Sequence, residues 1–108
     1  MIHELRIYKC LPGRLPDLNK RFETVTLKIW EKHNIRPVGF WTMLVGPSNQ
    51  DLYYLLEWKD LAERERIWNT FAADPEWRTL SATPGLTDPE IVLSISNVYL
   101  RPAAFSEI

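Results

Sequence analysis

The sequence has one cysteine, four scattered glycines and no long apolar run. Its only thiol, Cys10, cannot form an internal disulfide, which is consistent with a reducing compartment. No apolar stretch approaches the roughly 18 residues of a membrane span, and a strand-like segment follows Met1 almost at once. We therefore expect a cytoplasmic protein with no leader segment and no membrane partner.

An excess of charge of one sign is also missing. The chain carries 13 basic and 14 acidic residues, for a net charge of -1. Because nucleic-acid-binding domains usually carry a basic patch, we expect no nucleic-acid partner. The glycines form no phosphate-binding motif, and no G-x-S-x-G nucleophile elbow is present. With 45% hydrophobic residues, residues 1–108 are expected to form a single domain.

What the sequence does contain is clear hydrophobic periodicity. Residues 2–8 predict a strand, which a turn signal at residues 11–13 ends. From Arg14 onwards, apolar residues recur every three or four positions, which predicts an amphipathic helix of about five turns. The apolar positions of this helix are Leu15, Leu18, Phe22, Val25 and Ile29. Asn34 can adopt the left-handed conformation that ends such a helix.

Two further strands are predicted at residues 38–45 and 52–58, joined by a loop of turn-forming residues. Because side chains alternate along a strand, Phe40 and Leu44 share one face of the first strand, and its other face is apolar as well. The second strand is also apolar on both faces. A sheet with one wet face would alternate polar and apolar residues, so we expect both faces of this sheet to be covered.

The segment at residues 58–77 carries its own start and stop signals. Asp60 is expected to cap a helix, with Glu63 as its capping-box partner. The predicted apolar side is formed by Leu61, Trp68, Phe71 and Ala72, and the solvated side by Glu63, Arg64, Glu65, Arg66 and Asn69. Asp74 before Pro75 predicts a second cap and a short helix in a new direction. A loop and a final strand at residues 91–100 follow.

The predicted order is therefore β-α-β-β-α-β. This is the ferredoxin-like arrangement, an α+β fold in which a four-stranded antiparallel sheet carries two helices on one face. The other face would expose a larger apolar patch than a soluble monomer usually tolerates. We therefore expect a homodimer whose sheets pack face to face as a dimeric α/β barrel. Which face of strands 38–45 and 52–58 meets the partner stays open.

Several segments resemble the NIPSNAP family. They are HELRIY, PGRLPDL, GFW, GPSNQ, LAERE and AADPEW, and together they extend over nearly the whole chain. The resemblance implies a ferredoxin-like domain of the dimeric α/β-barrel superfamily. Members of that superfamily include cofactor-independent monooxygenases, haem-degrading enzymes, isomerases and binding proteins, so the resemblance does not imply one reaction.

The candidate site begins on the first strand, where Glu4, Arg6 and Tyr8 share one face. If a second subunit covers that face, the charge pair and the phenol would form the polar end of an apolar pocket. The competing interpretation is an ion pair that fixes the register of a dimer interface. Ser94 and Ser96 are expected to join this group from the final strand.

Three aromatic or imidazole side chains are weaker candidates. Trp41 can stack on a flat ligand, although a tryptophan in a strand is more often core or interface. His33 ends a helix, where it is either a surface imidazole favoured by the helix dipole or a general base or haem ligand. His3 and His33 are 30 residues apart without the spacing of a metal site, so we predict no metal and no cofactor.

Three functions remain open. The first is a homodimer that binds a small apolar or aromatic molecule in a barrel cavity, with Glu4 and Arg6 at its polar end. The second is a cofactor-independent monooxygenase or isomerase acting on an aromatic or quinone-like substrate, with Arg6 or His33 as the catalytic residue. The third is a protein-interaction module that uses the charged helix at residues 63–66.

Overall fold

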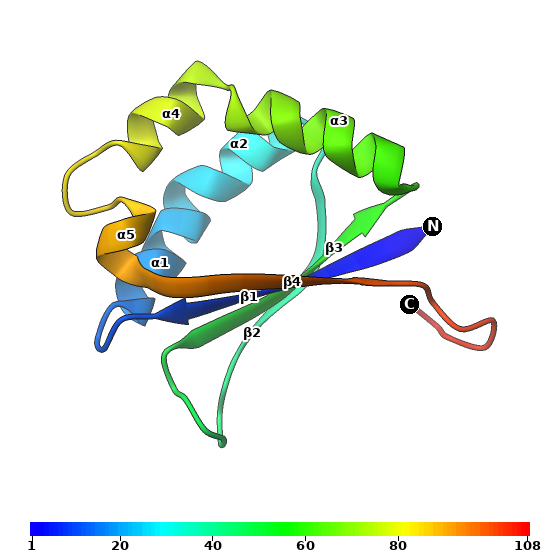
Figure 1. The fold of residues 1–108 in the computed structure, drawn as a ribbon, viewed down its shortest axis with the longest axis horizontal. Helices are drawn as coiled ribbons and strands as arrows, with labels where there is room; N and C mark the ends of the chain where they lie inside the picture. The colour runs from blue at the N-terminus through cyan, green and yellow to red at the C-terminus, as the bar shows by residue number, and fades with distance from the viewer.

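In the computed structural model, which describes residues 1–108, a four-stranded antiparallel sheet organises the chain (Figure 1). Its strands are β1 (Ile2–Cys10), β2 (Arg36–Thr42), β3 (Asp51–Trp58) and β4 (Val92–Leu100). The spatial order is β2-β3-β1-β4, and every neighbouring pair is antiparallel. This is the ferredoxin-like order, so the predicted α+β class and the central position of the first strand are confirmed.

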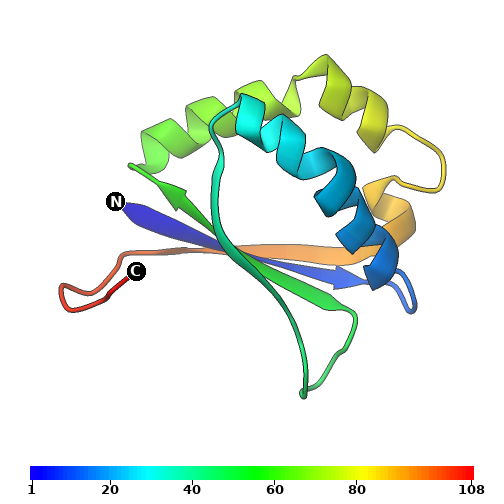
Figure 2. The same cartoon turned by 180° about the vertical axis from the view of Figure 1, so that it is seen from behind.

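The helices lie together on one face of this sheet, as the views from both sides show (Figures 1 and 2). The first is a continuous rod made of α1 (Leu15–Arg21), a π-helical segment η1 (Phe22–Thr26) and α2 (Leu27–Lys32). The second helical segment on this face consists of α3 (Leu61–Ala72) and α4 (Pro75–Ser81). A single helical turn, α5 (Asp88–Ile91), precedes β4. The opposite face of the sheet carries no helix, and we call it the open face.

Alternation along the strands decides which side chains enter the core. On the helix-covered face, Tyr8 of β1 lies beside β3, whose buried apolar residues are Leu52, Tyr54, Leu56 and Trp58. The long helical rod contributes Leu18, Ile29 and Trp30 to the same core, and α3 contributes Ile67 and Phe71. On the open face the apolar side chains remain partly exposed, among them Leu5 and Ile7.

The predicted caps are present. Asp60 Oδ1 accepts a hydrogen bond from the backbone N–H of Glu63 at 2.8 Å, and Asp74 Oδ1 accepts one from that of Glu76 at 2.8 Å. The Glu63 carboxylate accepts a hydrogen bond from the backbone N–H of Lys59, one residue before the cap. Asn34 has a φ of 59°, the left-handed conformation predicted for the end of the first helix.

The largest difference from the predicted boundaries is in the second strand. The second strand was expected at residues 38–45 but ends at Thr42, because Thr42 pairs with Leu52 and β3 begins only one residue earlier. Residues 43–45 therefore have no strand opposite them, and Leu44 is 97% exposed in the connecting loop. The strand also begins earlier than expected, since an edge strand tolerates Pro37 beside a register shift.

Candidate functional site

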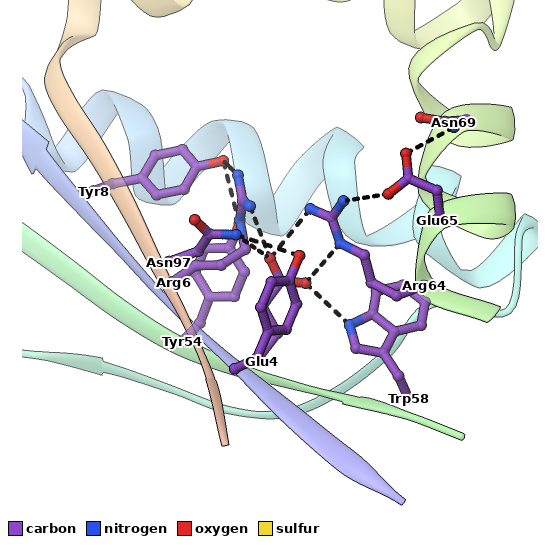
Figure 3. Close-up of polar contacts among 10 residues, drawn as sticks. Glu4, Arg6, Tyr8, Tyr54, Trp58, Arg64, Glu65, Asn69 and Asn97 are labelled. Atoms are coloured by element: carbon purple, nitrogen blue, oxygen red, sulfur yellow. Dashed lines mark hydrogen bonds and ion pairs between the residues drawn. The ribbon is translucent and has the colours of Figure 1, made fainter. Parts of the chain in front are cut away.

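A buried carboxylate is the anchor of a polar cluster on the helix-covered face (Figure 3). Glu4 is fully buried, and its two oxygens accept hydrogen bonds at 3.0–3.2 Å from the side chains of Arg6, Trp58, Arg64 and Asn97. Burial by itself would raise the pKa of Glu4, but hydrogen bonds from Arg64 and Asn97 and the charge of Arg6 outweigh it and lower the pKa. The carboxylate is thus held ionised and fully bonded.

Glu4 in turn positions Arg6, which binds two phenols. Arg6 Nε donates to Tyr54 Oη at 2.7 Å, and Arg6 Nη2 donates to Tyr8 Oη at 3.3 Å. The Tyr54 hydroxyl donates to Tyr8 Oη at 3.2 Å. Burial raises the pKa of Tyr54 well above its usual value, so this phenol stays protonated. Tyr8 Oη accepts two hydrogen bonds, while its own O–H has no acceptor in the chain.

A cavity of about 190 Å³ lies beside Arg6 and Tyr8, between the sheet and the helices. Half of the residues that line it are aromatic, namely Tyr8, Phe22, Trp30, Trp68, Phe71 and Trp77. The Arg6 guanidinium carbon lies 4.6 Å from the centroid of the Trp68 ring, close enough for a cation–π contact. The cavity therefore combines a flat apolar wall with a positively charged base.

A second ion pair lies at the far side of the cavity, between buried Arg21 and partly exposed Asp88. Arg21 Nη2 lies 2.7 Å from Asp88 Oδ1, and Arg21 Nη1 donates to the carbonyl of Leu86 at 2.7 Å. Both charged residues line the cavity. Through these two contacts Arg21 connects the segment before β4 to the first helix.

The π-helical segment lies at this cavity. Phe22 and Thr26, its first and last residues, both line the wall, and the backbone N–H of Leu27 donates to the carbonyl of Phe22, five residues earlier. Such π-turns interrupt the α-helical register and are frequent at functional sites. The one irregular stretch of the first helix therefore coincides with the cavity.

The structure keeps Glu4, Arg6 and Tyr8 together but separates the other predicted site residues from them. The face that bears Glu4, Arg6 and Tyr8 is covered by the chain's own helices, without a second subunit. The prediction that Ser94 and Ser96 join them is wrong: these serines pair with Lys9 and Ile7 and so lie on the open face. Asn97, opposite Arg6, occupies the place expected for them.

Trp41 also lies away from the cluster. It pairs with Tyr53 across the open face and is 52% exposed, so it does not line the cavity. Its neighbour Phe40 points to the helices instead, where its ring lies 5.3 Å from that of Tyr54. A stacking role for Trp41 in the same pocket as Arg6 is therefore excluded by the register of β2.

Two arginines of the site were missed in the sequence, although each carries a signal. Arg64 was assigned to the solvated side, yet its side chain is only 13% exposed and binds Glu4. It precedes Trp68 by four residues and so shares its face of α3. Arg21 follows Leu18 by three residues and likewise falls on the apolar stripe of its helix. A charge within an apolar stripe is the pattern that would have found both.

His33 has a structural partner outside the cavity. His33 Nε2 lies 2.6 Å from Asp74 Oδ2, which Lys32 Nζ approaches at 2.7 Å. Asp74 therefore joins the end of the first helix to the start of α4. His33 is not among the residues that line the cavity, so the general-base or haem-ligand role considered for it has no geometric support at this site.

The contacts of Asp74 with Lys32 and His33 predict that the stability of the fold depends on pH. Hydrogen bonds from Lys32 and His33 lower the pKa of Asp74 below its ordinary 3.8. A lowered folded-state pKa contributes stability above the ordinary value, which is lost as the pH falls through the folded value. Asp74→Asn is expected to be less stable than the wild type at pH 7, with the difference shrinking below about pH 4. Urea unfolding from pH 7 to pH 2 measures this, and a constant difference would contradict it.

Comparisons with known proteins agree with this fold. The NIPSNAP family profile matches residues 3–107, and the search of curated proteins finds no match. An uncharacterized NIPSNAP-like domain protein from Burkholderia xenovorans has a TM-score of 0.87 at 26% identity, over 99% of this chain and 89% of the other. A NIPSNAP family protein of unknown function from Agrobacterium tumefaciens has a TM-score of 0.87 at 24% identity, over 99% and 92%.

A more distant structure shares the fold alone. It is a mutant of MhuD with two manganese protoporphyrin IX molecules bound per active site, with a TM-score of 0.61 at 12% identity over 98% of each chain. No helix of the present chain is long and apolar enough to cross a membrane. Since the family profile covers nearly the entire sequence, the chain belongs to the NIPSNAP family.

Proposed function

We propose that this protein binds a small aromatic molecule in the cavity between its sheet and its helices. The observation that carries the proposal is the wall of six aromatic side chains around a space of about 190 Å³. Aromatic rings stack edge to face or offset on one another, so such a wall favours a flat ring over an aliphatic chain. The cavity lies within one chain and needs no partner to form it.

The size of the cavity limits the ligand. An engineered apolar cavity of about 150 Å³ holds benzene, whereas pockets for drug-sized ligands span about 300–1,000 Å³. A cavity of about 190 Å³ thus suits a single substituted ring. A porphyrin does not fit, and no histidine lines the space.

A homodimer is the second part of the proposal. The helices cover only one face of the sheet, which leaves the open face for a partner. This face carries partly exposed apolar side chains from all four strands, namely Leu5, Ile7, Trp41, Tyr53, Leu55 and Val98. A continuous patch of this kind is self-complementary about a two-fold axis, so a second copy of the chain is the occupant we propose.

An enzyme acting on an aromatic or quinone-like substrate is the second candidate. The free O–H of Tyr8 favours it, since a phenol fixed by Arg6 and Tyr54 could donate to an oxyanion that develops on a bound ring. Oxygen uptake or substrate loss that falls on Tyr8→Phe while ligand binding persists would support this cofactor-independent monooxygenase or isomerase. Unchanged turnover in that variant would remove Tyr8 from the reaction.

The third hypothesis, a protein-interaction module at residues 63–66, loses part of its basis. Glu63 caps α3 and pairs with Arg36, and Arg64 points inward to Glu4. Only Glu65 and Arg66 remain as an exposed charged surface on this turn. A pair of opposite charges is too common on helix surfaces to indicate a partner.

A cavity-filling substitution tests the binding proposal. Ala72 of α3 lines the cavity, so Ala72→Phe is expected to place a ring in it and to abolish the binding of toluene and benzoate. Ala73, the next residue, is exposed like Ala72 but does not line the cavity, so Ala73→Phe is the matched control. Titration calorimetry should show binding to the wild type and to the control only. Equal binding to Ala72→Phe would place the ligand elsewhere.

A further inference from the structure

The chain leaves three buried side-chain polar atoms without a hydrogen-bond partner: Arg21 Nε, Thr26 Oγ1 and Trp30 Nε1. All three belong to residues that line the aromatic cavity. Buried polar groups are nearly always bonded, because an unpaired one loses its hydration without compensation. Because the three residues that carry these atoms share one cavity, a polar group bound in that cavity is the partner we consider for them.

Thr26 shows that this is not a general property of the helices. Thr24, Thr70 and Thr83 each donate their hydroxyl to the backbone carbonyl four residues earlier, at 2.7–2.9 Å. Thr26 has no such bond although it is almost fully buried. It ends the π-helical segment, where the carbonyl of Phe22 accepts from Leu27. The carbonyl four residues before Thr26 is thus engaged in the π-turn, whereas Thr24, in the same segment, keeps its bond to the Lys20 carbonyl.

The unpaired groups are donors. Arginine Nε and the indole Nε1 each carry a single N–H and cannot accept, and the Thr26 hydroxyl can do either. The Tyr8 O–H adds a fourth donor, since Tyr8 Oη already accepts from Arg6 and Tyr54. A ligand that satisfies this set must supply acceptor oxygens.

The charges around the cavity are mainly positive, which suits a ligand with acceptor oxygens. Arg6 and Arg21 line it, and the only carboxylate in the lining, Asp88, is already paired with Arg21. Behind Arg6, the single carboxylate of Glu4 is shared between Arg6 and Arg64, which leaves a buried excess of positive charge. An anion is therefore favoured over a neutral molecule, and the lining holds no unpaired carboxylate for a cation.

We propose that the ligand is a small aromatic acid, a ring that carries an anionic oxygen group such as a carboxylate. The ring lies against the aromatic wall, and the anionic oxygens accept from the donors of Arg21, Thr26, Trp30 and Tyr8. This inference rests on the proposed function, because it names the class of molecule that the same cavity takes.

Three probes with the same ring test the charge of the ligand: the anion benzoate, neutral toluene and the cation benzylamine. In calorimetric titrations of the wild-type protein at fixed ionic strength, benzoate is expected to bind at least tenfold more tightly than toluene, and benzylamine most weakly. Toluene binding as tightly as benzoate would overturn the aromatic-acid inference and leave the cavity proposal standing. No binding by any probe would overturn both.

Thr26→Val tests the named donors, with Thr24→Val as the control in the same helical segment. Removing one hydrogen bond should weaken benzoate about fivefold in Thr26→Val and leave toluene unchanged. Thr24→Val should bind both probes as the wild type does, because its hydroxyl is bonded to the Lys20 carbonyl. Equal benzoate affinity in wild type and Thr26→Val would remove Thr26 from the site. The comparison of the three probes needs no variant, so it decides the sign of the ligand even if Thr26→Val fails to fold.

Discussion

Glu4→Gln is expected to lower the free energy of unfolding by about 3–5 kcal/mol. The substitution keeps the shape of the side chain but removes the only buried counter-charge of Arg6 and Arg64. Breaking a buried pair leaves its cationic partner desolvated and unpaired, which costs more than the pair itself contributes. The amide would also present an N–H₂ group to donors that need an acceptor. Urea unfolding at pH 7, followed by tryptophan fluorescence, measures the loss.

The control is Glu65→Gln, at the exposed edge of this cluster. The Glu65 side chain is 67% exposed and lies 3.7 Å from Arg64, so its loss is expected to cost less than about 0.5 kcal/mol. The double variant Glu4→Gln with Arg64→Gln should cost less than the sum of the single changes, since either one already breaks the same pair. A loss below about 1 kcal/mol in Glu4→Gln would contradict the description of Glu4 as a buried anchor.

The second large effect is expected on the open face of the sheet. Wild-type protein should have about twice the 12.7 kDa chain mass in light scattering after size exclusion, across a dilution series. Val98→Asp places a charge in the proposed interface and should reduce the mass to that of one chain, because a buried unpaired charge opposes association. The helices and the cavity of each chain should remain folded in this variant, since Val98 is partly exposed on an edge strand.

Leu61→Asp is the matched control for the dimer. Leu61 is an exposed apolar residue at the start of α3, away from the open face, and its substitution should leave the mass unchanged. A wild-type protein that is monomeric at every concentration would contradict the proposed face-to-face dimer. It would not remove the cavity, because the residues that line the cavity come from one chain.

The features that the sequence predicted correctly are local ones. Asp60 and Asp74 could be identified as caps because each satisfies a backbone N–H two or three residues ahead, a contact that depends on a few neighbouring residues. Asn34 could be placed at a helix end because its left-handed conformation is likewise a local property of the chain. Together with the change of hydrophobic period from strands to helices, such signals give the element order and hence the ferredoxin-like class.

The site could be predicted only in part, because it depends on which residues face each other across the sheet. Glu4, Arg6 and Tyr8 share a face through alternation along one strand, which the sequence shows directly. Whether Asn97 or Ser96 faces them from β4 depends on the register, and a shift of one residue exchanges the two faces of a strand. Neither that register nor the choice of covered face can be read from an isolated strand.

The unpaired buried atoms could not be predicted from the sequence at all. Thr24 and Thr26 both lie in the π-helical segment, and only the Thr24 hydroxyl has a backbone acceptor, the Lys20 carbonyl. The indole of Trp30 has no partner because its neighbours in the folded core are rings, among them Phe22 and Phe71. Both facts arise from packing between elements distant in the chain.

The measurement that tests the central claim most directly is the response of the indole N–H signals in a two-dimensional ¹H–¹⁵N NMR spectrum. The protein has five tryptophans, and the Trp30 signal can be assigned from its loss in Trp30→Phe. On addition of benzoate, or of toluene if that binds more tightly, the Trp30 and Trp68 signals are expected to shift. Those of Trp41, on the open face, and Trp58, bonded to Glu4, should stay in place. A ligand that shifts Trp41 and leaves Trp30 unchanged would contradict the account, because it would bind on the open face and not in the cavity.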